Sequence, residues 1–466
     1  MAHQSGENVD DRTDWQWAGD HRQATPPAPG KSVAGSILDR RRFLKTTAAS
    51  AGVATLFADT AAADTTGIER FDRRVPSFDG VEIASTVFLP DDDGQYPVVM
   101  ATHGYGGDRS SVVGFGEFFA RQGYVVITWD QRGFGESGGE VDSSGPRTTR
   151  DVEALIDFLI GENPASEARF TSQVFAPRGD PSVGMIGGSY AGGVQMNASA
   201  IDDRIDALFP IIPWYDLRFS LAPDDVPKQG WTTLLQAVGA TGSRGLTSGD
   251  GQPERRDIEN GVSPRLYEFY AEALALNEMS QTAESFFAVR STVSKADEVT
   301  ADALVVQGWP DTLFVPNEGQ SLVRALNTNG NDNEAKLVFY NDGHTIDGNG
   351  GTKAFSITDT VLQWFETKLK GNAARGASDA GFAPVTYYDV QAGAAANDSQ
   401  LDDVSAADSP LFHETDSFPP TDATTVGLSL ADVAGVGSTF IANSGAPTST
   451  SQVAPTNEDA ASGARL

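Results

Sequence analysis

The chain of 466 residues contains no cysteine. This absence excludes disulfides, thiol catalysis, cysteine-ligated zinc and a lipid-modified cysteine. No apolar run reaches the roughly 18 residues that a membrane-spanning helix needs, so stable membrane insertion is not expected. Histidine is scarce too, with five residues in the whole chain. A reaction that needs an imidazole base therefore has few candidates.

Basic residues are also few: lysine and arginine total 33 against 64 aspartates and glutamates, a net charge of −31. Such a chain repels phosphate backbones, so nucleic acid is not an expected partner. Only eight of the basic residues are lysine. Acidic excess with little lysine resembles the proteins of salt-loving archaea, whose carboxylates hold water in concentrated salt. An acidic mesophilic protein is the alternative, and both interpretations predict a soluble protein.

The first part of the chain is typical of an exported protein. Residues 1–38 are polar and irregular, which predicts disorder. Asp39-Arg-Arg-Arg-Phe-Leu-Lys45, a weakly apolar stretch and Ala61-Ala-Ala63 then resemble a twin-arginine signal with its cleavage site. An amphipathic helix is the alternative, but 46–54 has no apolar stripe. We therefore predict export through the twin-arginine machinery to the cell surface or medium, and exclude 1–63 from the fold.

The next 300 residues alternate between strand-like and helix-like patterns. Phe78–Leu89 suits an opening antiparallel pair of strands. Short apolar runs that read as buried strands follow at 97–102, 124–129, 182–186, 207–212, 303–306 and 336–340. Amphipathic spacing predicts helices over 152–160, 317–326 and 355–369. This alternation indicates an α/β fold, with a mostly parallel sheet that helices cover on both faces.

Changes in pattern divide the chain further. No strand-like run occurs between Trp214 and Val299, where 263–279 is helical. This predicts a helical cap over the carboxyl edge of the sheet, inserted at 214–299 between two parts of the α/β domain at 64–213 and 300–371. The acidic segment 372–466 contains a predicted strand at 385–390 and a loose tail, which suggests a reduced or truncated β domain.

The sharpest motif is Gly187-Gly-Ser-Tyr-Ala-Gly192, which follows the predicted strand 182–186 and precedes a helix-compatible run. Small neighbours allow a strained strand-to-helix turn that lifts a serine hydroxyl above the sheet. The alternative is a phosphate-binding turn, but no lysine follows to meet a phosphate. We therefore predict that Ser189 is a nucleophile.

A serine hydroxyl is a weak nucleophile and needs a general base. His344 lies after Ser189 and at the carboxyl end of the predicted strand 336–340. His103 precedes the serine, His413 lies in the acidic tail, and the other two histidines precede the export signal. Because α/β-hydrolases use the chain order serine, acid, histidine, we predict that His344 is the base.

The acid should be a carboxylate at a strand end between these two residues. Asp311 follows the predicted strand 303–306 and would orient the imidazole and stabilise its positive charge. Asp342 is only two residues from the histidine and cannot easily reach its far ring nitrogen. Asp216 also follows a strand, but at the mouth of the insertion. We therefore predict Asp311.

Two donors are expected to stabilise the oxyanion. One is the backbone amide of Tyr190, which follows the nucleophile. The other comes from the loop His103-Gly-Tyr-Gly-Gly107, through the amide or the phenol of Tyr105; alternatively, this tyrosine only packs. No cofactor and no metal ion are expected.

Three motifs together carry a family resemblance: Gly187–Gly192, Asp130-Gln-Arg-Gly-Phe-Gly-Glu-Ser-Gly-Gly-Glu140 and Gly308-Trp-Pro-Asp311. They look like the Xaa-Pro dipeptidyl-peptidase and cocaine esterase family of α/β-hydrolases, over roughly 70–370. Members of this family usually carry a large jelly-roll domain after the catalytic one. Only about 95 residues follow Gly371 here, so a reduced or truncated domain is expected.

The resemblance implies a function and the roles of the residues. It implies a nucleophile, an acid, a base and two oxyanion donors, which are Ser189, Asp311, His344, the Tyr105 phenol and the Tyr190 amide. The expected protein is a secreted serine hydrolase that cleaves N-terminal Xaa-Pro peptides or related amides and esters. Its first alternative is a carboxylic ester hydrolase like cocaine esterase. A different α/β-hydrolase chemistry and a non-catalytic surface protein with a damaged triad are further alternatives.

An aminopeptidase must also hold the free ammonium group of its substrate. The cap should then supply carboxylates near the nucleophile, and it contains Glu259, Glu268, Glu272 and Glu278. In so acidic a chain, their presence does not discriminate between the peptidase and the esterase.

Overall fold

The computed structural model describes residues 67–242, 261–344, 356–371, 380–389 and 405–420. The predicted export signal and the predicted loose tail lie outside these ranges. None of the described helices is long and apolar enough to cross a lipid bilayer.

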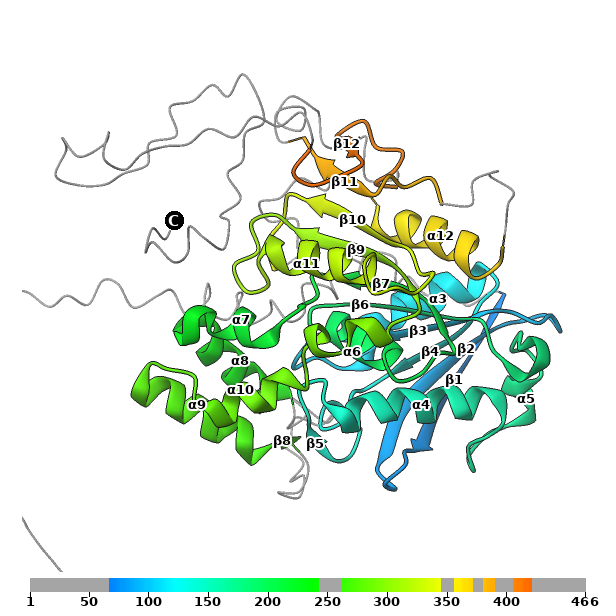
Figure 1. The fold of residues 1–466 in the computed structure, drawn as a ribbon. Helices are drawn as coiled ribbons and strands as arrows, with labels where there is room; N and C mark the ends of the chain where they lie inside the picture. Colours follow the sequence, from blue (N-terminus) through cyan, green and yellow to red (C-terminus); the bar gives the residue numbers. More distant parts are fainter. Residues whose placement is uncertain (1–66, 243–260, 345–355, 372–379, 390–404, 421–466) are drawn as a thin grey trace, which may run out of the picture. The chain divides into compact units, whose positions relative to one another are not determined.

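A large, mostly parallel β-sheet organises the described residues (Figure 1). Its ten described strands follow the order β1-β2-β4-β3-β6-β7-β9-β10-β11-β12. The pairs β1–β2, β2–β4 and β11–β12 are antiparallel and the other pairs are parallel. The strands are β1 (Ile68–Pro76), β2 (Glu82–Pro90), β3 (Val98–Thr102), β4 (Val125–Trp129), β6 (Val183–Gly188), β7 (Ile205–Ile211), β9 (Asp302–Gly308), β10 (Ala335–Tyr340), β11 (Val385–Tyr388) and β12 (Phe412–Thr415).

Helices cover both faces of this sheet, because alternate side chains of each buried strand point to opposite sides. On β3, Val98 and Met100 belong to one hydrophobic core, while Val99 and Ala101 belong to the other. The first core is closed by α4 (Pro146–Ile160), α6 (Tyr190–Ser199) and α11 (Pro316–Leu326), and the second by α3 (Val113–Arg121) and α12 (Ile357–Lys368). The α/β-hydrolase fold expected from the sequence is therefore observed.

Short elements complete the connections between the large ones. They are η2 (Arg109–Val112), β5 (Glu140–Val141), α5 (Ala168–Thr171) and η3 (Pro177–Gly179).

The two ends of the sheet differ in detail from the expectation. The opening antiparallel pair is present, but its first strand is Ile68–Pro76, and 78–80 lies in the turn before β2. At the other end, β11 pairs with β10 and β12 pairs with β11. The described strands of the acidic C-terminal segment thus extend the hydrolase sheet and do not form a sheet of their own.

The residues between β7 and β9 form the expected helical insertion. Its elements are α7 (Leu217–Leu221), η4 (Pro223–Asp225), α8 (Gln229–Gly242), β8 (Gly261–Val262), α9 (Pro264–Leu276), α10 (Gln281–Ala288), η5 (Thr292–Ser294) and η6 (Ala296–Glu298). The expectation that this interval contains no strand is wrong, because β8 pairs in parallel with β5. Two residues are too few to show the period-two pattern that reveals a strand in a sequence.

Candidate active site

Ser189 lies at the sharp turn between β6 and α6, with φ of 56° and ψ of −117°. A residue with a β-carbon rarely adopts a positive φ, and such strain is typical of active sites. Small neighbours make the turn possible, since a β-carbon on Gly187 would lie 2.4 Å from the β-carbon of Ala191. The Ser189 amide donates to the carbonyl of Ile211 at 2.9 Å, which fixes the turn against β7.

His344 connects the serine to a buried carboxylate. Its Nε2 lies 2.9 Å from Ser189 Oγ, and its Nδ1 lies 2.8 Å from Asp311 Oδ2. Asp311 is 3% exposed, and its other oxygen, Oδ1, accepts the amides of Leu313 at 2.8 Å and Phe314 at 3.0 Å. These two amides hold the carboxylate so that Oδ2 faces the imidazole. The structure thus brings the predicted nucleophile, base and acid into one continuous chain of hydrogen bonds.

The cap contributes directly to the setting of this histidine. Trp231 of α8 packs edge-on against the His344 ring, with ring centroids 5.3 Å apart, and Phe314 packs against the ring at 4.9 Å. The Trp231 indole nitrogen donates to Thr312 Oγ1 at 3.1 Å, and Lys228 Nζ donates to the carbonyls of Thr312 and Leu313 at 3.0 and 2.8 Å. Helix α8 therefore contacts both the base and the loop that carries the acid.

The rival histidines have other partners. His103 is 1% exposed; its Nδ1 donates to the carbonyl of Gly104 at 2.8 Å, and its Nε2 accepts the amide of Gln131 at 2.9 Å. Burial lowers the pKa of His103, so this ring acts as a neutral link between two loops. His413 pairs with Asp389 at 2.7 Å on β12. His3 and His21 lie outside the described residues.

The two other candidates for the acid, Asp216 and Asp342, bind groups other than His344. Asp216 caps α7 by accepting the amide of Arg218 at 3.0 Å, and it pairs with the guanidinium of that residue at 2.6 Å. Asp342 accepts the amide of Gly343 at 2.9 Å, while the far ring nitrogen of His344 faces Asp311. Among these three carboxylates, Asp311 is the one whose contact with a ring nitrogen of His344 is observed.

Both predicted oxyanion donors belong to residues that line the same cavity as Ser189. Tyr190 is the first residue of α6, where the backbone amides of a helix lack partners within it and favour negative charge. The Tyr105 ring packs edge-on against the ring of Tyr190 at 5.3 Å and lines the same cavity as Ser189. Burial raises the pKa of the Tyr105 phenol well above its usual range, so this hydroxyl stays protonated and able to donate.

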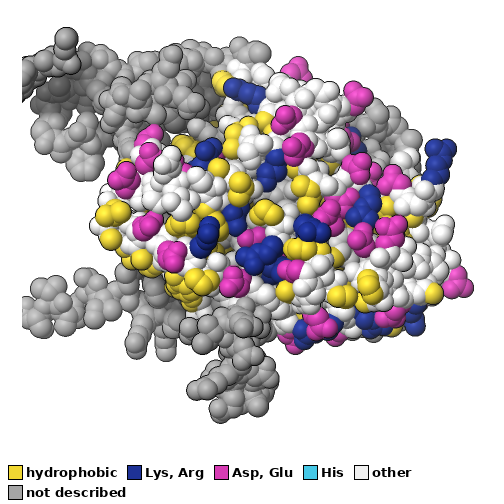
Figure 2. All heavy atoms as spheres, turned by 60° about the horizontal axis from the view of Figure 1, so that its bottom comes forward, with side chains coloured by type: hydrophobic (Ala, Val, Ile, Leu, Met, Phe, Trp, Pro, Cys, Tyr) yellow, Lys and Arg dark blue, Asp and Glu magenta, His cyan; other side chains and the backbone are white. Residues whose placement is uncertain are grey.

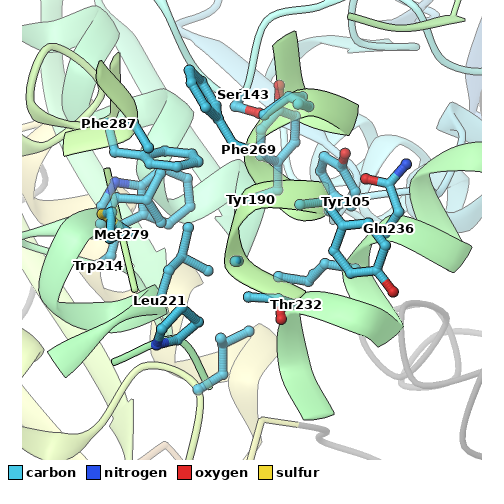
Figure 3. A pocket seen from close by; sticks show the side chains of 18 of the residues that line it. Tyr105, Ser143, Tyr190, Trp214, Leu221, Thr232, Gln236, Phe269, Met279 and Phe287 are labelled. Atoms are coloured by element: carbon cyan, nitrogen blue, oxygen red, sulfur yellow. The ribbon is translucent and has the colours of Figure 1, made fainter. Parts of the chain in front are cut away.

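A cavity of about 120 Å³ opens at Ser189 and extends between the sheet and the cap (Figure 3). Aromatic and aliphatic side chains from α7, α8, α9 and α10 form most of its wall. Polar groups are few, and Glu278 is the one carboxylate among the described lining residues. Glu278 is an exposed residue. The sequence predicted a helical cap but did not show which helix faces would line a cavity.

Charged residues of the Asp130–Glu140 motif form hydrogen bonds and ion pairs that hold neighbouring segments in place. Asp130 accepts the backbone amide of Arg109 at 2.6 Å and that of Glu136 at 2.7 Å. Arg132 is 1% exposed and pairs with Asp151 at 2.5 Å. These contacts hold the loop after β4 against η2 and α4.

No group of three or more histidine, aspartate or glutamate side chains is arranged to hold a metal ion in the part of the chain that the structure describes.

Comparisons with known proteins place this fold and site in a family. The sequence matches the profile of the X-Pro dipeptidyl-peptidase (S15) family over residues 79–346. Cutinase 2 of Thermobifida cellulosilytica is 29% identical over 130 residues, which are 28% of this chain and 44% of the cutinase. An uncharacterised 31.7 kDa protein of Escherichia coli is 28% identical over 136 residues, 29% of this chain and 43% of that protein. The chain therefore spans less than half the length of these two relatives.

A solved structure of another protein has a similar fold. The CocE/NonD family hydrolase of Staphylococcus aureus aligns with 77% of this chain and 60% of its own, with a TM-score of 0.50 and 15% identity. Such low identity supports a shared fold only. The family profile covers more than half of the sequence, and the chain belongs to the X-Pro dipeptidyl-peptidase (S15) family of α/β-hydrolases.

Proposed function

We propose that this protein is a serine hydrolase that works by acyl transfer through Ser189, His344 and Asp311. The observation that carries the proposal is the pair of contacts at His344, 2.9 Å to the serine hydroxyl and 2.8 Å to the carboxylate. A hydroxyl held on a strained turn beside an oriented imidazole is the arrangement that makes serine nucleophilic.

The first half of the reaction forms an acyl-enzyme. Ser189 Oγ attacks the carbonyl carbon of the substrate while its proton moves to His344 Nε2. Asp311 stabilises the imidazolium through Nδ1. The amide of Tyr190 and the phenol of Tyr105 donate to the oxygen that becomes negative. When the tetrahedral intermediate collapses, the leaving oxygen or nitrogen takes the proton from Nε2.

The second half restores the enzyme. Water attacks the acyl carbon and gives its proton to His344 Nε2, and a second tetrahedral intermediate forms with the same oxyanion donors. Collapse of this intermediate breaks the bond to Ser189 Oγ, which recovers the proton from Nε2. The carboxylic acid then leaves the cavity.

The cavity supports an ester with an apolar acyl group as the substrate. Its wall is mainly aromatic and aliphatic, which favours burial of a hydrocarbon group. An aminopeptidase needs buried carboxylates for the substrate ammonium group. Four cap glutamates were considered above for this role. Glu278 is exposed at the lining, Glu268 is exposed, Glu272 accepts a hydrogen bond from Ser280 at 2.7 Å, and Glu259 lies outside the described residues.

The second candidate is cleavage of N-terminal Xaa-Pro peptides, which the family membership supports. Glu278 would then hold the ammonium group at the mouth of the cavity. The two functions share one mechanism and differ in the groups that flank the scissile bond.

A direct comparison of substrates tests both candidates. We expect the purified protein in concentrated salt to hydrolyse p-nitrophenyl esters of short fatty acids faster than alanyl-prolyl p-nitroanilide. Ser189→Ala should abolish hydrolysis, whereas Ser172→Ala, an exposed serine on another part of the chain, should retain it. Faster anilide turnover would select the dipeptidyl-peptidase, and unchanged turnover by Ser189→Ala would reject the mechanism.

The proposed place of action is outside the cell, after twin-arginine export. The basic motif at 39–45 supports this proposal. Replacing Arg40 and Arg41 by lysine should leave the activity inside the cells, while the wild type delivers it to the medium or cell surface. Equal distribution of the two proteins would reject this route.

A further inference from the structure

Two consecutive serines in the turn between β5 and α4 have an uncommon backbone conformation. Ser143 has a φ of 50° and Ser144 a φ of 62°. Residues with a β-carbon adopt this left-handed region at an energetic cost, and tertiary contacts must hold them there. The turn thus depends on the structure around it and not on its own sequence.

Buried hydrogen bonds from several elements hold this turn. Arg290, which follows α10 of the cap, donates from Nε to the carbonyl of Asp142 at 2.7 Å and from Nη2 to its carboxylate at 2.7 Å. Asn197 of α6 donates to the carbonyl and the hydroxyl of Ser144 at 3.1 and 2.9 Å. The amide of Ser144 donates to the phenol oxygen of Tyr190 at 3.0 Å. The turn is therefore tied to the cap and to the residue that follows the nucleophile.

This network leaves one hydroxyl uncommitted. The Ser144 hydroxyl is bonded by Asn197, but Ser143 Oγ has no hydrogen-bond partner among the described residues, although Ser143 is only 8% exposed. Ser143 lines the same cavity as Ser189, and Figure 3 shows it among the lining side chains together with Phe269 and Tyr190. The hydroxyl is thus a polar group in a mainly apolar wall near the nucleophile.

We propose that Ser143 is a specificity-determining residue whose hydroxyl binds a polar atom of the substrate inside the cavity. This rests on the proposed function, since the cavity holds an acyl group only if Ser189 is the nucleophile. The substrate class is a carboxylic ester with a largely apolar acyl group that carries one hydrogen-bond acceptor, such as an ether or carbonyl oxygen. The apolar body contacts the wall formed by Phe269, Ala283 and Phe287.

The physical reason is the cost of an unpaired polar group. An apolar acyl group that fills the cavity excludes water from the Ser143 hydroxyl, which is unfavourable unless the substrate itself supplies a hydrogen-bond partner. A site built to hydrogen-bond one group of a substrate rejects analogues that lack it more strongly than a hydrophobic wall rejects a missing methylene. Ser143 therefore gives the cavity discrimination that its apolar wall cannot supply.

Matched pairs of esters test the proposal. In each pair, an ether oxygen replaces one methylene of the acyl chain, as in p-nitrophenyl 3-methoxypropanoate and p-nitrophenyl pentanoate, and the oxygen position is varied along the chain. For the best-fitting pair, we expect the ratio of kcat/KM, ether over alkyl, to fall about three- to tenfold in Ser143→Ala. Ser172→Ala should keep the wild-type ratio.

The outcomes separate this inference from the proposed function. An unchanged ratio for every pair in Ser143→Ala overturns the inference, whether or not overall activity falls, because a residue that only supports the turn affects both esters alike. Activity in Ser189→Ala overturns the proposed function instead. If hydrolysis is slow, the dissociation constants of the two esters are measured in Ser189→Ala and in the double variant Ser189→Ala with Ser143→Ala. The ratio of these constants between the ether and the alkyl ester does not depend on turnover and decides the inference.

Discussion

Asp311 contacts the imidazole through only one of its two oxygens. This determines how the amide group of an asparagine would be oriented at the same position. The amides of Leu313 and Phe314 donate to Oδ1, so the oxygen of an asparagine would remain at that position. Its NH2 group would then face His344 Nδ1 and force the ring proton to Nε2. The imidazole could no longer accept the proton of the serine.

We therefore expect Asp311→Asn to lower kcat by roughly 10⁴-fold with little change in KM. The control is Asp342→Asn, which changes the rival carboxylate and should keep kcat within about threefold. Steady-state kinetics on a p-nitrophenyl ester measure both variants. Similar losses in the two variants would contradict the assignment of the acid.

Glu318 is a buried carboxyl group outside the catalytic contacts. It is 1% exposed and accepts the amides of Tyr215 and Asp216 at 2.6 and 2.8 Å and the Ser220 hydroxyl at 2.8 Å. Burial raises its pKa to about 7 in spite of these donors. Because the folded protein then holds this proton more tightly than the unfolded chain does, the resulting stabilisation is complete below about pH 4.3 and is lost as the pH rises through 7.

Glu318→Gln removes this titration. We expect the free energy of unfolding of the wild type to fall relative to that of Glu318→Gln by about 3 kcal/mol between roughly pH 4.5 and pH 7. Denaturant unfolding at a series of pH values measures the difference. Parallel pH profiles of the two proteins would show that the carboxyl group is ionised throughout this range.

Individual residues were predictable from sequence to different degrees. Ser189, Asp311 and His344 could be selected because each follows a strand in the order that the fold requires, and the structure brings them together. Ser143 could not, since its conformation depends on Arg290 and on other residues far away in the chain. Glu318 looked like an ordinary helical glutamate, because its burial arises only when α11 packs beside the loop after β7.

At the scale of elements, helix α8 packs closely against the loop that carries Tyr105. A β-carbon on Gly239 of α8 would lie 2.6 Å from the Tyr105 hydroxyl oxygen, and one on Gly242 would lie 2.2 Å from the carbonyl oxygen of Gly106. Glycine allows this approach, and it places the cap helix where it can fix the phenol. The cap is therefore expected to shape the oxyanion site as well as the cavity.

Gly239→Ala should displace the Tyr105 phenol and lower kcat about tenfold. Tyr105→Phe removes the hydroxyl itself, and we expect it to lower kcat by about 10²-fold. Gly230→Ala is the matched control on the same helix, because a β-carbon there meets nothing within 4 Å. It should raise stability slightly, since alanine favours helix over glycine, and keep kcat. Wild-type kcat in Tyr105→Phe would show that the phenol takes no part in the reaction.

The elements themselves were largely predictable, and their ends were less so. Buried parallel strands such as β3 and β9 stand out because helices cover both faces and their central residues, 98–101 and 303–306, are all apolar. Strand β1 was placed too late, because its exposed face carries charged residues that hide its length. The pairing of β11 and β12 with the main sheet depends on contacts across the chain, which no local pattern contains.

At the scale of the molecule, acidic and basic side chains lie close together on the face that Figure 2 shows. Several arginines pair with carboxylates distant in the chain, such as Arg204 with Asp157 at 2.7 Å and Arg109 with Asp130 at 2.5 Å. The 33 basic residues cannot match 64 acidic ones. Mutual repulsion of the remaining carboxylates therefore opposes folding in dilute salt.

We expect the melting temperature to rise as salt increases from about 0.01 to 1 M, because the screening length falls from roughly 30 to 3 Å over this range. The rise should shrink at pH 4, where many carboxylates become protonated. Thermal unfolding followed by circular dichroism measures both series. A melting temperature that does not respond to salt at pH 7 would contradict the expectation of a protein adapted to salt.

The nucleophilic role of Ser189 supports every other functional statement, and covalent labelling tests it most directly. Treatment with an alkyl fluorophosphonate, followed by mass spectrometry of the intact chain and its peptides, should show one phosphonyl group per chain, attached to Ser189. Ester hydrolysis should disappear in proportion to the label, and Ser189→Ala should take up none. Inactivation with the label on another residue, or an active Ser189→Ala protein, would contradict the account.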